Sequence, residues 1–199
     1  MKVTTYEDEK LWLEARLGRI TGTRLSGIIS KRGTALKKPF WEILAERVAI
    51  PASEENAMDR GKRLEEIGIE RFTQETGIKV TNNLELWQRD DNPDIAISPD
   101  GVINNERAVE VKCLSSAAHC EAYITQQIPS EYEYQVIQYF CVSDELQTLY
   151  FVFFDPRMPK DFFYIVVTRE EKKEEIAMCL QAQRDALVLL KEYEDKLTF

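Results

Sequence analysis

Two acidic residues and a lysine in the middle of the sequence form the first candidate site. Asp100 lies in a Pro-Asp-Gly turn signal, and Glu110 and Lys112 follow within a short apolar stretch. Alternation along an expected strand at 108–112 places Glu110 and Lys112 on the same face. A preceding strand can end at Asp100, reverse and return as the strand that carries Glu110. The two carboxylates and the ammonium group therefore converge.

This set of groups suits phosphodiester hydrolysis assisted by a divalent metal. Mg²⁺ takes oxygen ligands, and one or two protein carboxylates with the substrate phosphate complete its usual site. Lys112 would hold or deprotonate the attacking water, but its ordinary pKa of about 10.4 requires the metals to depress that value before it acts as a base. The alternative is a plain hairpin turn followed by an exposed strand face, since both patterns are common.

A helix expected at 58–76 and ended by Gly77 supplies a third acidic candidate. Glu65 shares one face of this helix with small and apolar residues, namely Gly61, Gly68, Ile69 and Phe72. Two interior glycines cost about 1 kcal/mol each relative to alanine, so we expect close approach of another element. A carboxylate on such a face is costly unless it is paired or near a metal. The alternative is a surface ion pair of Glu65 with Lys62 or Arg71.

A further helix, expected at 131–143, carries a Gln-x-x-x-Tyr spacing. Gln135 and Tyr139 fall on one face together with Gln138 and Val142, so an amide and a phenol can reach the same ligand. The alternative is an aromatic-rich core helix whose glutamines point to solvent.

The strongest positive charge lies near the start of the chain. Seven basic residues and no acidic ones occur between positions 15 and 40: Arg16, Arg19, Arg24, Lys31, Arg32, Lys37 and Lys38. A helix end at Gly18 and a helix start at residues 21–23 would bring Arg16, Arg19 and threonine hydroxyls together, a geometry that receives a phosphate. The alternatives are helix capping by threonine and a solvated basic face. The formal net charge of −9 argues against non-specific nucleic-acid binding by the rest of the surface.

Length and composition bound the class of protein. The 199 residues, 44% hydrophobic and 31% charged, suit a single globular domain over residues 1–199 and argue against disorder. No apolar run approaches the ~20 residues of a membrane span, and the first ten residues lack a signal core, so we expect a cytoplasmic protein. Cys113, Cys120, Cys141 and Cys179 have no zinc or iron–sulfur spacing and are expected to be reduced thiols. The single histidine, His119, disfavours a Ser-His-Asp triad.

The coarse order of elements predicts an α/β fold with a central mixed sheet. We expect helices at 7–17, 21–30, 39–48, 58–76, partly at 115–127, 131–143 and 169–197, and strands at 84–89, 96–98, 102–103, 108–112, 148–155 and 161–168. The last two strands are joined by the turn at 155–160 and form a hairpin.

Together these motifs resemble a known group of enzymes. The Ser-Pro-Asp-Gly run at 98–101, the Glu-Val-Lys run at 110–112, the Glu65 helix and the Gln135 helix are similar to the PD-(D/E)xK nuclease superfamily, with its restriction-endonuclease-like core. Residues 12–23, 61–65 and 155–158 are similar to the lambda exonuclease and YqaJ-type viral recombinase family. The resemblance extends over residues 12–167.

The resemblance implies an activity and partners. It implies a 5′-to-3′ exonuclease on linear double-stranded DNA with 5′-phosphate ends, which releases 5′-mononucleotides and leaves a 3′ single-stranded tail. Two Mg²⁺ ions per active site, with Mn²⁺ able to substitute, would serve the chemistry. Family members work with a single-strand annealing protein in phage recombination, and a homotrimer without membrane association is implied.

The resemblance also assigns roles to individual residues. Asp100, Glu110 and the Val111 carbonyl would bind metal, Lys112 would handle the water, Glu65 would support the metals and Gln135 would orient the site. Arg16 would hold the 5′-phosphate with Thr23 and Ser98, and further DNA contacts would come from Arg19, Arg32, Tyr139 and Met58. For Met58, an apolar residue near the start of the Glu65 helix, core packing is the preferred interpretation and a wedge between terminal base pairs is the alternative.

Two departures from the family pattern affect substrate detail. Thr23 keeps a hydroxyl where the family usually has serine, and Arg19 stands where lambda exonuclease has an apolar residue. An endonuclease or junction resolvase on the same core, and a non-catalytic DNA-binding scaffold for recombination, remain as alternative functions.

Overall fold

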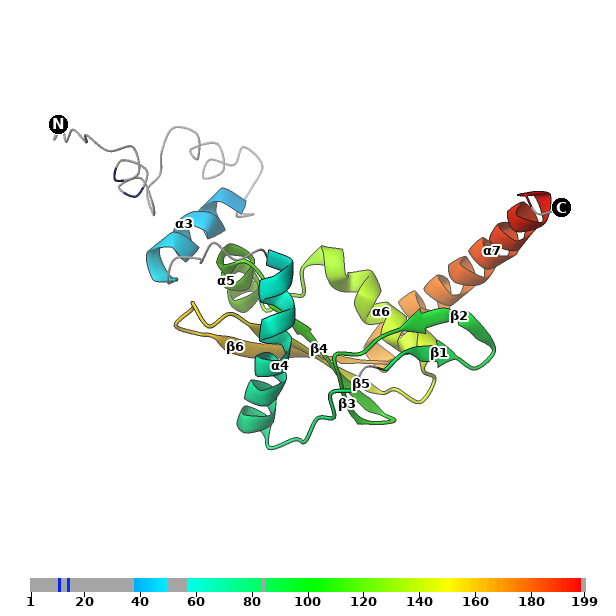
Figure 1. Cartoon of the computed structure of the whole chain (residues 1–199), viewed down its shortest axis with the longest axis horizontal. Helices are drawn as coiled ribbons and strands as arrows, with labels where there is room; N and C mark the ends of the chain where they lie inside the picture. The colour runs from blue at the N-terminus through cyan, green and yellow to red at the C-terminus, as the bar shows by residue number, and fades with distance from the viewer. Residues whose placement is uncertain (1–10, 12–13, 15–37, 50–56, 84, 198–199) are drawn as a thin grey trace.

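A computed structural model describes residues 11, 14, 38–49, 57–83 and 85–197 (Figure 1). The helices are α3 (Lys38–Val48), α4 (Ala57–Thr76), α5 (Ser116–Thr125), α6 (Glu133–Val142) and α7 (Lys173–Leu197), with short 3₁₀ helices η1 (Ser130–Tyr132) and η2 (Glu170–Lys172). The strands are β1 (Trp87–Arg89), β2 (Asn92–Ile97), β3 (Gly101–Asn104), β4 (Arg107–Lys112), β5 (Thr148–Phe154) and β6 (Phe162–Thr168). The helix expected at 21–30 falls outside the described residues, and so does the one expected at 7–17 except for residues 11 and 14, which are helical.

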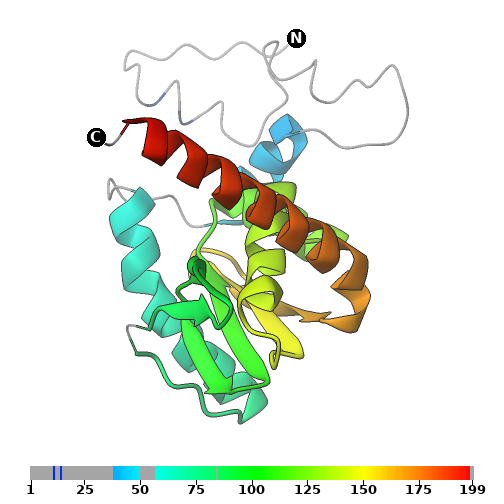
Figure 2. The ribbon, with the colours of Figure 1, turned by 90° about the vertical axis from the view of Figure 1, so that its right-hand side faces the viewer.

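The central sheet is mixed, as the sequence predicts. Its strand order is β3-β4-β5-β6; β4 runs parallel to β5, and the two outer pairs are antiparallel. The two last strands form the expected hairpin. Figure 2 shows α4 (cyan) on one side of the sheet and α6 (yellow-green) on the other. The result is a three-layer α/β arrangement in which β4 is a central strand.

The alternation predicted for β4 is confirmed by its two packing environments. Val109 and Val111 join the core cluster that also holds Ile69 and Phe72 of α4. Ala108 belongs to the opposite cluster, which is built mainly from α6 and β5. Because helices pack on both faces of the sheet at this strand, the four consecutive residues from 108 to 111 are buried. The side chain of Glu110 must therefore be accommodated inside the protein.

A two-stranded hairpin, β1–β2, packs outside the central sheet. The predicted strand at 84–89 is shorter in the structure and the one at 96–98 is longer, because a register shift next to Arg89 lets residues from 92 onward pair. Arg89 ties the hairpin to the end of α6 by donating to Asp144 Oδ1 at 2.8 Å and to the Cys141 carbonyl. Gln138 of α6 donates to the Ala96 carbonyl at 3.2 Å. These contacts fix β2, which leads directly into Asp100.

Element ends follow the local signals closely. Gly77, with φ of 71°, ends α4 in the left-handed conformation that glycine permits. The helix expected from 131 begins at Glu133 because a 3₁₀ turn precedes it, and the last helix is likewise preceded by a 3₁₀ turn. Within the described part of the chain no helix is both long and apolar enough to cross a membrane. The four cysteines are free thiols, as expected.

A buried polar junction joins the end of β5 to the start of α5. Asp155 is fully buried and accepts from Ser116 Oγ at 2.7 Å and from Arg157 Nε at 2.9 Å. Burial opposes ionisation of Asp155, but the hydrogen bonds from Arg157 and Ser116 outweigh it and lower its pKa. The first turn of α5 is thereby held against the sheet, close in sequence to the end of β4.

Close approach of α4 to the sheet explains one of its interior glycines. A Cβ atom at Gly68 would lie 2.7 Å from Val111 Cγ1 and 3.5 Å from Phe154 Cβ. The expectation that another element approaches this helix closely is therefore confirmed at Gly68.

We predict that Gly68→Ala destabilises the protein although alanine favours helix. The gain in helix propensity is about 1 kcal/mol, whereas overpacking a buried contact costs about 1–3 kcal/mol. The free energy of unfolding from urea titration should therefore fall. Val111→Ala removes the clashing atom, so the double variant should lose about 1 kcal/mol less than the sum of the two single losses. If the losses of the two single variants simply add in the double variant, the contact with Val111 does not set the distance between α4 and the sheet.

Candidate active site

Glu110 lies at the centre of the predicted site and is 1% exposed. One of its oxygens, Oε1, accepts from Lys112 Nζ and from Gln135 Nε2, and the other, Oε2, accepts from the Tyr139 hydroxyl. A buried carboxylate is very costly unless it is paired and hydrogen-bonded. The shared face of Glu110 and Lys112 and the Gln-x-x-x-Tyr face of α6 thus meet as predicted. The alternatives of an exposed strand face and of solvent-facing glutamines do not fit these contacts.

Lys112 is a charged group in this arrangement. Burial by itself lowers the pKa of Lys112, but the charge of Glu110, its hydrogen bond and the charge of Asp100 outweigh burial and raise it. The side chain is therefore an ammonium group at neutral pH. A role as general base requires added positive charge nearby to bring that pKa down.

Asp100 follows β2 through the turn and meets β4 at its edge. Its Oδ2 accepts the backbone N–H of Val111 at 2.8 Å. Burial, and then the negative charge of Glu110, raises the pKa of Asp100 to about 7. The charge of Glu65 acts in the same direction, so α4 delivers its carboxylate within electrostatic reach of Asp100. Negative charge at this point exceeds what the neighbouring Lys112 offsets.

The donor set fits a hard divalent cation. Val111 donates its N–H toward Asp100, and the N–H and C=O of one strand residue point to the same side, so its carbonyl also faces Asp100. Two carboxylates and a carbonyl are oxygen ligands of the kind that Mg²⁺ prefers. Among the described residues no group of three or more His, Cys, Asp or Glu side chains forms a metal cage. Two carboxylates and one carbonyl would leave open positions on an ion for water or a phosphate oxygen.

The structure corrects the predicted role of Tyr139. The side chain was expected to contact DNA but is fully buried, and its ring makes an edge contact with Trp87 at 6.4 Å between centroids. Burial, and then the charge of Glu110, raises the pKa of Tyr139, so the hydroxyl stays protonated and donates to that carboxylate. Tyr139 supports Glu110 from the core, and direct DNA contact is ruled out by its burial.

The predicted DNA contacts divide into described and undescribed residues. Ser98 is exposed at the end of β2, two residues before Asp100. Met58 lies in α4, but its side chain is not among the described ones. Arg16, Arg19, Thr23 and Arg32 lie outside the described residues, so their roles stay predictions.

One residue at the site was not identified from the sequence. The ring of Tyr132, in η1, has its centroid 5.2 Å from Lys112 Nζ. Its position three residues before Gln135 is the signal that points to it, because residues three apart face the same side of a helical segment.

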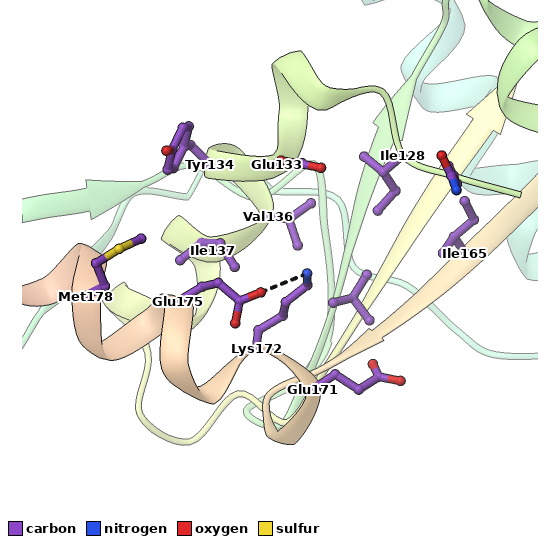
Figure 3. Close-up of a pocket in the computed structure, with 12 residues that line it drawn as sticks. Ile128, Glu133, Tyr134, Val136, Ile137, Ile165, Glu171, Lys172, Glu175 and Met178 are labelled. Carbon is purple, nitrogen blue, oxygen red and sulfur yellow. Dashed lines mark hydrogen bonds and ion pairs between the residues drawn. The ribbon is translucent and has the colours of Figure 1, made fainter. Parts of the chain in front are cut away.

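An open groove of about 730 Å³ is lined by residues of α6, β6, η2 and the start of α7 (Figure 3). Ile128, Tyr134, Ile137, Ile165 and Met178 supply its apolar lining. None of the predicted site residues lines it, so the convergent charges at β4 rather than this groove define the candidate active site.

The fold and the site together define the class of protein. A mixed sheet flanked by helices, with Asp100, Glu110 and Lys112 at one end of a central strand, is a core of the PD-(D/E)xK nuclease type. Residues 11–145 match the family model of the YqaJ-like viral recombinase domain. Because this match spans more than half of the chain, the chain belongs to the YqaJ-like viral recombinase family.

Solved structures of exonucleases are similar to the chain. The alkaline exonuclease LHK-Exo from Laribacter hongkongensis and LHK-Exo in complex with dAMP are each 27% identical, with a TM-score of 0.56 over 95% of this chain and 100% of theirs. A phage related exonuclease from Haemophilus somnus 129PT is 16% identical over 85% of this chain and 94% of its own, with a TM-score of 0.43. No curated protein matches the chain. The family and the LHK-Exo structures support a nuclease related to recombination.

We predict that Asp100→Asn stabilises the metal-free protein at neutral pH. The pKa of Asp100 is about 7 in the folded protein and 3.8 ordinarily, so the folded state binds the proton more tightly and loses stability as pH rises through that interval. The loss is on the order of 2–4 kcal/mol, and asparagine avoids it while keeping an acceptor for the Val111 N–H.

Thermal unfolding in EDTA from pH 4 to pH 8 measures this difference. The two proteins should converge near pH 4 and separate toward pH 8, with the variant more stable. Added Mg²⁺ should raise the melting temperature of the wild type more than that of Asp100→Asn. Parallel pH curves for the two proteins in EDTA would show that ionisation of Asp100 does not destabilise the folded protein.

Proposed function

We propose that the chain is a Mg²⁺-dependent 5′-to-3′ exonuclease on linear double-stranded DNA. It releases 5′-mononucleotides and leaves 3′ single-stranded tails for recombination by strand annealing. The observation that carries the proposal is the convergence of Asp100 and Glu110 with Lys112 at the end of β4. Membership of the viral recombinase family supports a role in recombination, and the LHK-Exo complex with dAMP supports a mononucleotide product.

The residues of the chain divide the chemistry among them. Asp100, Glu110 and the Val111 carbonyl would hold two Mg²⁺ ions, with Mn²⁺ able to substitute, and these ions would supply activation of the water and neutralisation of charge on the phosphate. Lys112 places its ammonium group where it can hold the attacking water and offset charge on the phosphoryl oxygens. Gln135 and Tyr139 keep the Glu110 carboxylate oriented from α6. Glu65 adds negative charge from α4 to support the cations.

End recognition is assigned to the basic segment near the start of the chain. Arg16 would bind the 5′-phosphate with help from Thr23 and Ser98, and Arg19 and Arg32 would contact the DNA backbone. The acidic remainder of the chain, which has a net charge of −9 overall, would limit non-productive adhesion to DNA. A homotrimer and a single-strand annealing protein are the proposed partners.

We predict that Lys112→Ala abolishes at least 99% of the digestion of a 5′-phosphorylated linear duplex in Mg²⁺. Removal of a charge placed at the reacting phosphate typically costs about 10²–10³ in rate. Strand-specific end labels should show loss from 5′ termini, with 5′-mononucleotides as products, and EDTA should stop the reaction. Lys173→Ala, at a lysine of α7 whose side chain is 74% exposed, is the matched control and should retain full activity.

A covalently closed circular duplex of the same sequence distinguishes the rival functions. An exonuclease that requires ends leaves the circle intact, whereas an endonuclease or a junction resolvase converts it to nicked or linear forms. Wild-type activity in Lys112→Ala would remove the assignment of the reaction to this site. Absence of Mg²⁺-dependent turnover on any duplex would favour a binding scaffold.

We predict that Arg16→Ala reduces the preference for 5′-phosphate over 5′-hydroxyl ends. A charge-assisted hydrogen bond to phosphate contributes about 1.5–3 kcal/mol, so the ratio of rates on the two ends should fall roughly 10- to 100-fold. The rate on the 5′-hydroxyl duplex should change little and serves as the internal reference. An unchanged ratio would separate Arg16 from recognition of the terminal phosphate.

A further inference from the structure

The aromatic ring of Tyr132 faces the ammonium group of Lys112. Its centroid lies 5.2 Å from Lys112 Nζ, within the ~6 Å range of a cation–π contact. Glu110 accepts a hydrogen bond from the same ammonium group. Lys112 is therefore held between a carboxylate and a ring face, and the lysine side chain is 20% exposed.

The ring is fixed in place by its own neighbours. Tyr132 ends the short helix η1, where its backbone N–H donates to the Pro129 carbonyl at 2.9 Å. Its ring packs 6.0 Å from the ring of Phe151, a fully buried residue of β5. The backbone turn and the core contact hold the ring before any substrate arrives.

We propose that Tyr132 is a positioning residue that fixes the Lys112 ammonium group in the site through its ring face. The inference rests on the proposed nuclease function for its catalytic consequence, but the contact itself belongs to the protein without substrate. The ring, not the hydroxyl group, does the positioning.

Lys112 and Gln135 share one oxygen of Glu110, so Lys112 needs a second contact to hold its ammonium group in place. Because Oε1 of Glu110 accepts from both side chains, any rearrangement of that carboxylate weakens its hold on the lysine. A lysine chain has several rotatable bonds, and one shared hydrogen bond restrains it poorly. The contact with the Tyr132 ring does not depend on the Glu110 oxygens and keeps the ammonium group beside the reacting phosphate.

Four variants separate the ring from the hydroxyl group and from general disturbance of the segment. Tyr132→Phe keeps the ring, while Tyr132→Leu and Tyr132→Met remove it and keep most of the apolar volume against Phe151. Tyr134→Leu is the matched control, because Tyr134 is two residues away and 71% exposed. Figure 3 shows Tyr134 on α6 among the residues that line the groove.

The first readout is made in EDTA and needs no nuclease activity. Each protein is treated with a limiting amine-acylating reagent, and modification of Lys112 is measured by mass spectrometry against exposed lysines of the same sample. We expect modification of Lys112 to be at least threefold faster in Tyr132→Leu and Tyr132→Met. It should remain at the wild-type rate in Tyr132→Phe and Tyr134→Leu. Equal rates in all five proteins would overturn the proposal.

The second readout is steady-state digestion of a linear duplex in Mg²⁺. Loss of a cation–π contact should lower kcat about 3- to 30-fold in the Leu and Met variants, with KM for the duplex nearly unchanged. Tyr132→Phe should restore wild-type kcat. A loss of activity in Tyr132→Phe equal to that in Tyr132→Leu would assign the role to the hydroxyl group and overturn the proposal.

A third test uses NMR of the wild-type protein, so it does not depend on whether any variant folds. The Lys112 ε-methylene protons should be shifted upfield by the Tyr132 ring in the metal-free protein, and ordinary lysine shifts would overturn the proposal. If the wild type digests no DNA, the proposed function fails while the labelling and NMR results still decide the role of Tyr132.

Discussion

A single buried carboxylate constrains the arrangement of this protein. Glu110 lies between Val109 and Val111 in the buried part of β4, which is covered on both faces, and an unpaired charge there would cost several kcal/mol. Three donors from two elements satisfy it: Lys112 on the same strand, and Gln135 and Tyr139 on α6. The position of α6 is therefore set by hydrogen bonding as well as by apolar contact. The same donors fix the direction in which the carboxylate presents its oxygens.

The two helical layers contribute differently to the site. The α6 side neutralises and orients Glu110, whereas the α4 side adds the negative charge of Glu65 near Asp100. Gly68 allows α4 to approach Val111 closely, so this charge reaches the end of β4. The α6 side thus provides hydrogen bonds to the buried Glu110 carboxylate. The α4 side leaves an excess of negative charge beside Asp100. That asymmetry is what a cation-dependent site requires, and it opposes the stability of the metal-free protein.

Much of the fold and of the site could be predicted from sequence, for identifiable reasons. Alternation predicted the two faces of β4, since one residue of slippage would have placed Glu110 in the α4 core. Helical spacing correctly placed Gln135 and Tyr139 on one face of α6. It could not predict that Tyr139 is fully buried, because spacing defines which residues share a face and not how far that face is from solvent. Tyr132 was missed because its approach to Lys112 depends on a 3₁₀ turn before α6 and on packing against Phe151. The boundaries of β1 and β2 depend on a register shift at Arg89, which propensity does not reveal.

The electrostatics of Lys112 decide how it can serve hydrolysis. Its surroundings raise its pKa, although burial alone would lower it, because Glu110 and Asp100 both favour the charged form. In this state the side chain has no lone pair with which to accept a proton, and its contribution is a fixed positive charge. Asp100 and Glu110 would hold the proposed cations, whose positive charge would oppose that stabilisation and lower the pKa of Lys112. Under the proposed function, the carboxylates that hold the ammonium group would also be the residues that hold the cations, so binding of the cations and the charge state of Lys112 would be linked.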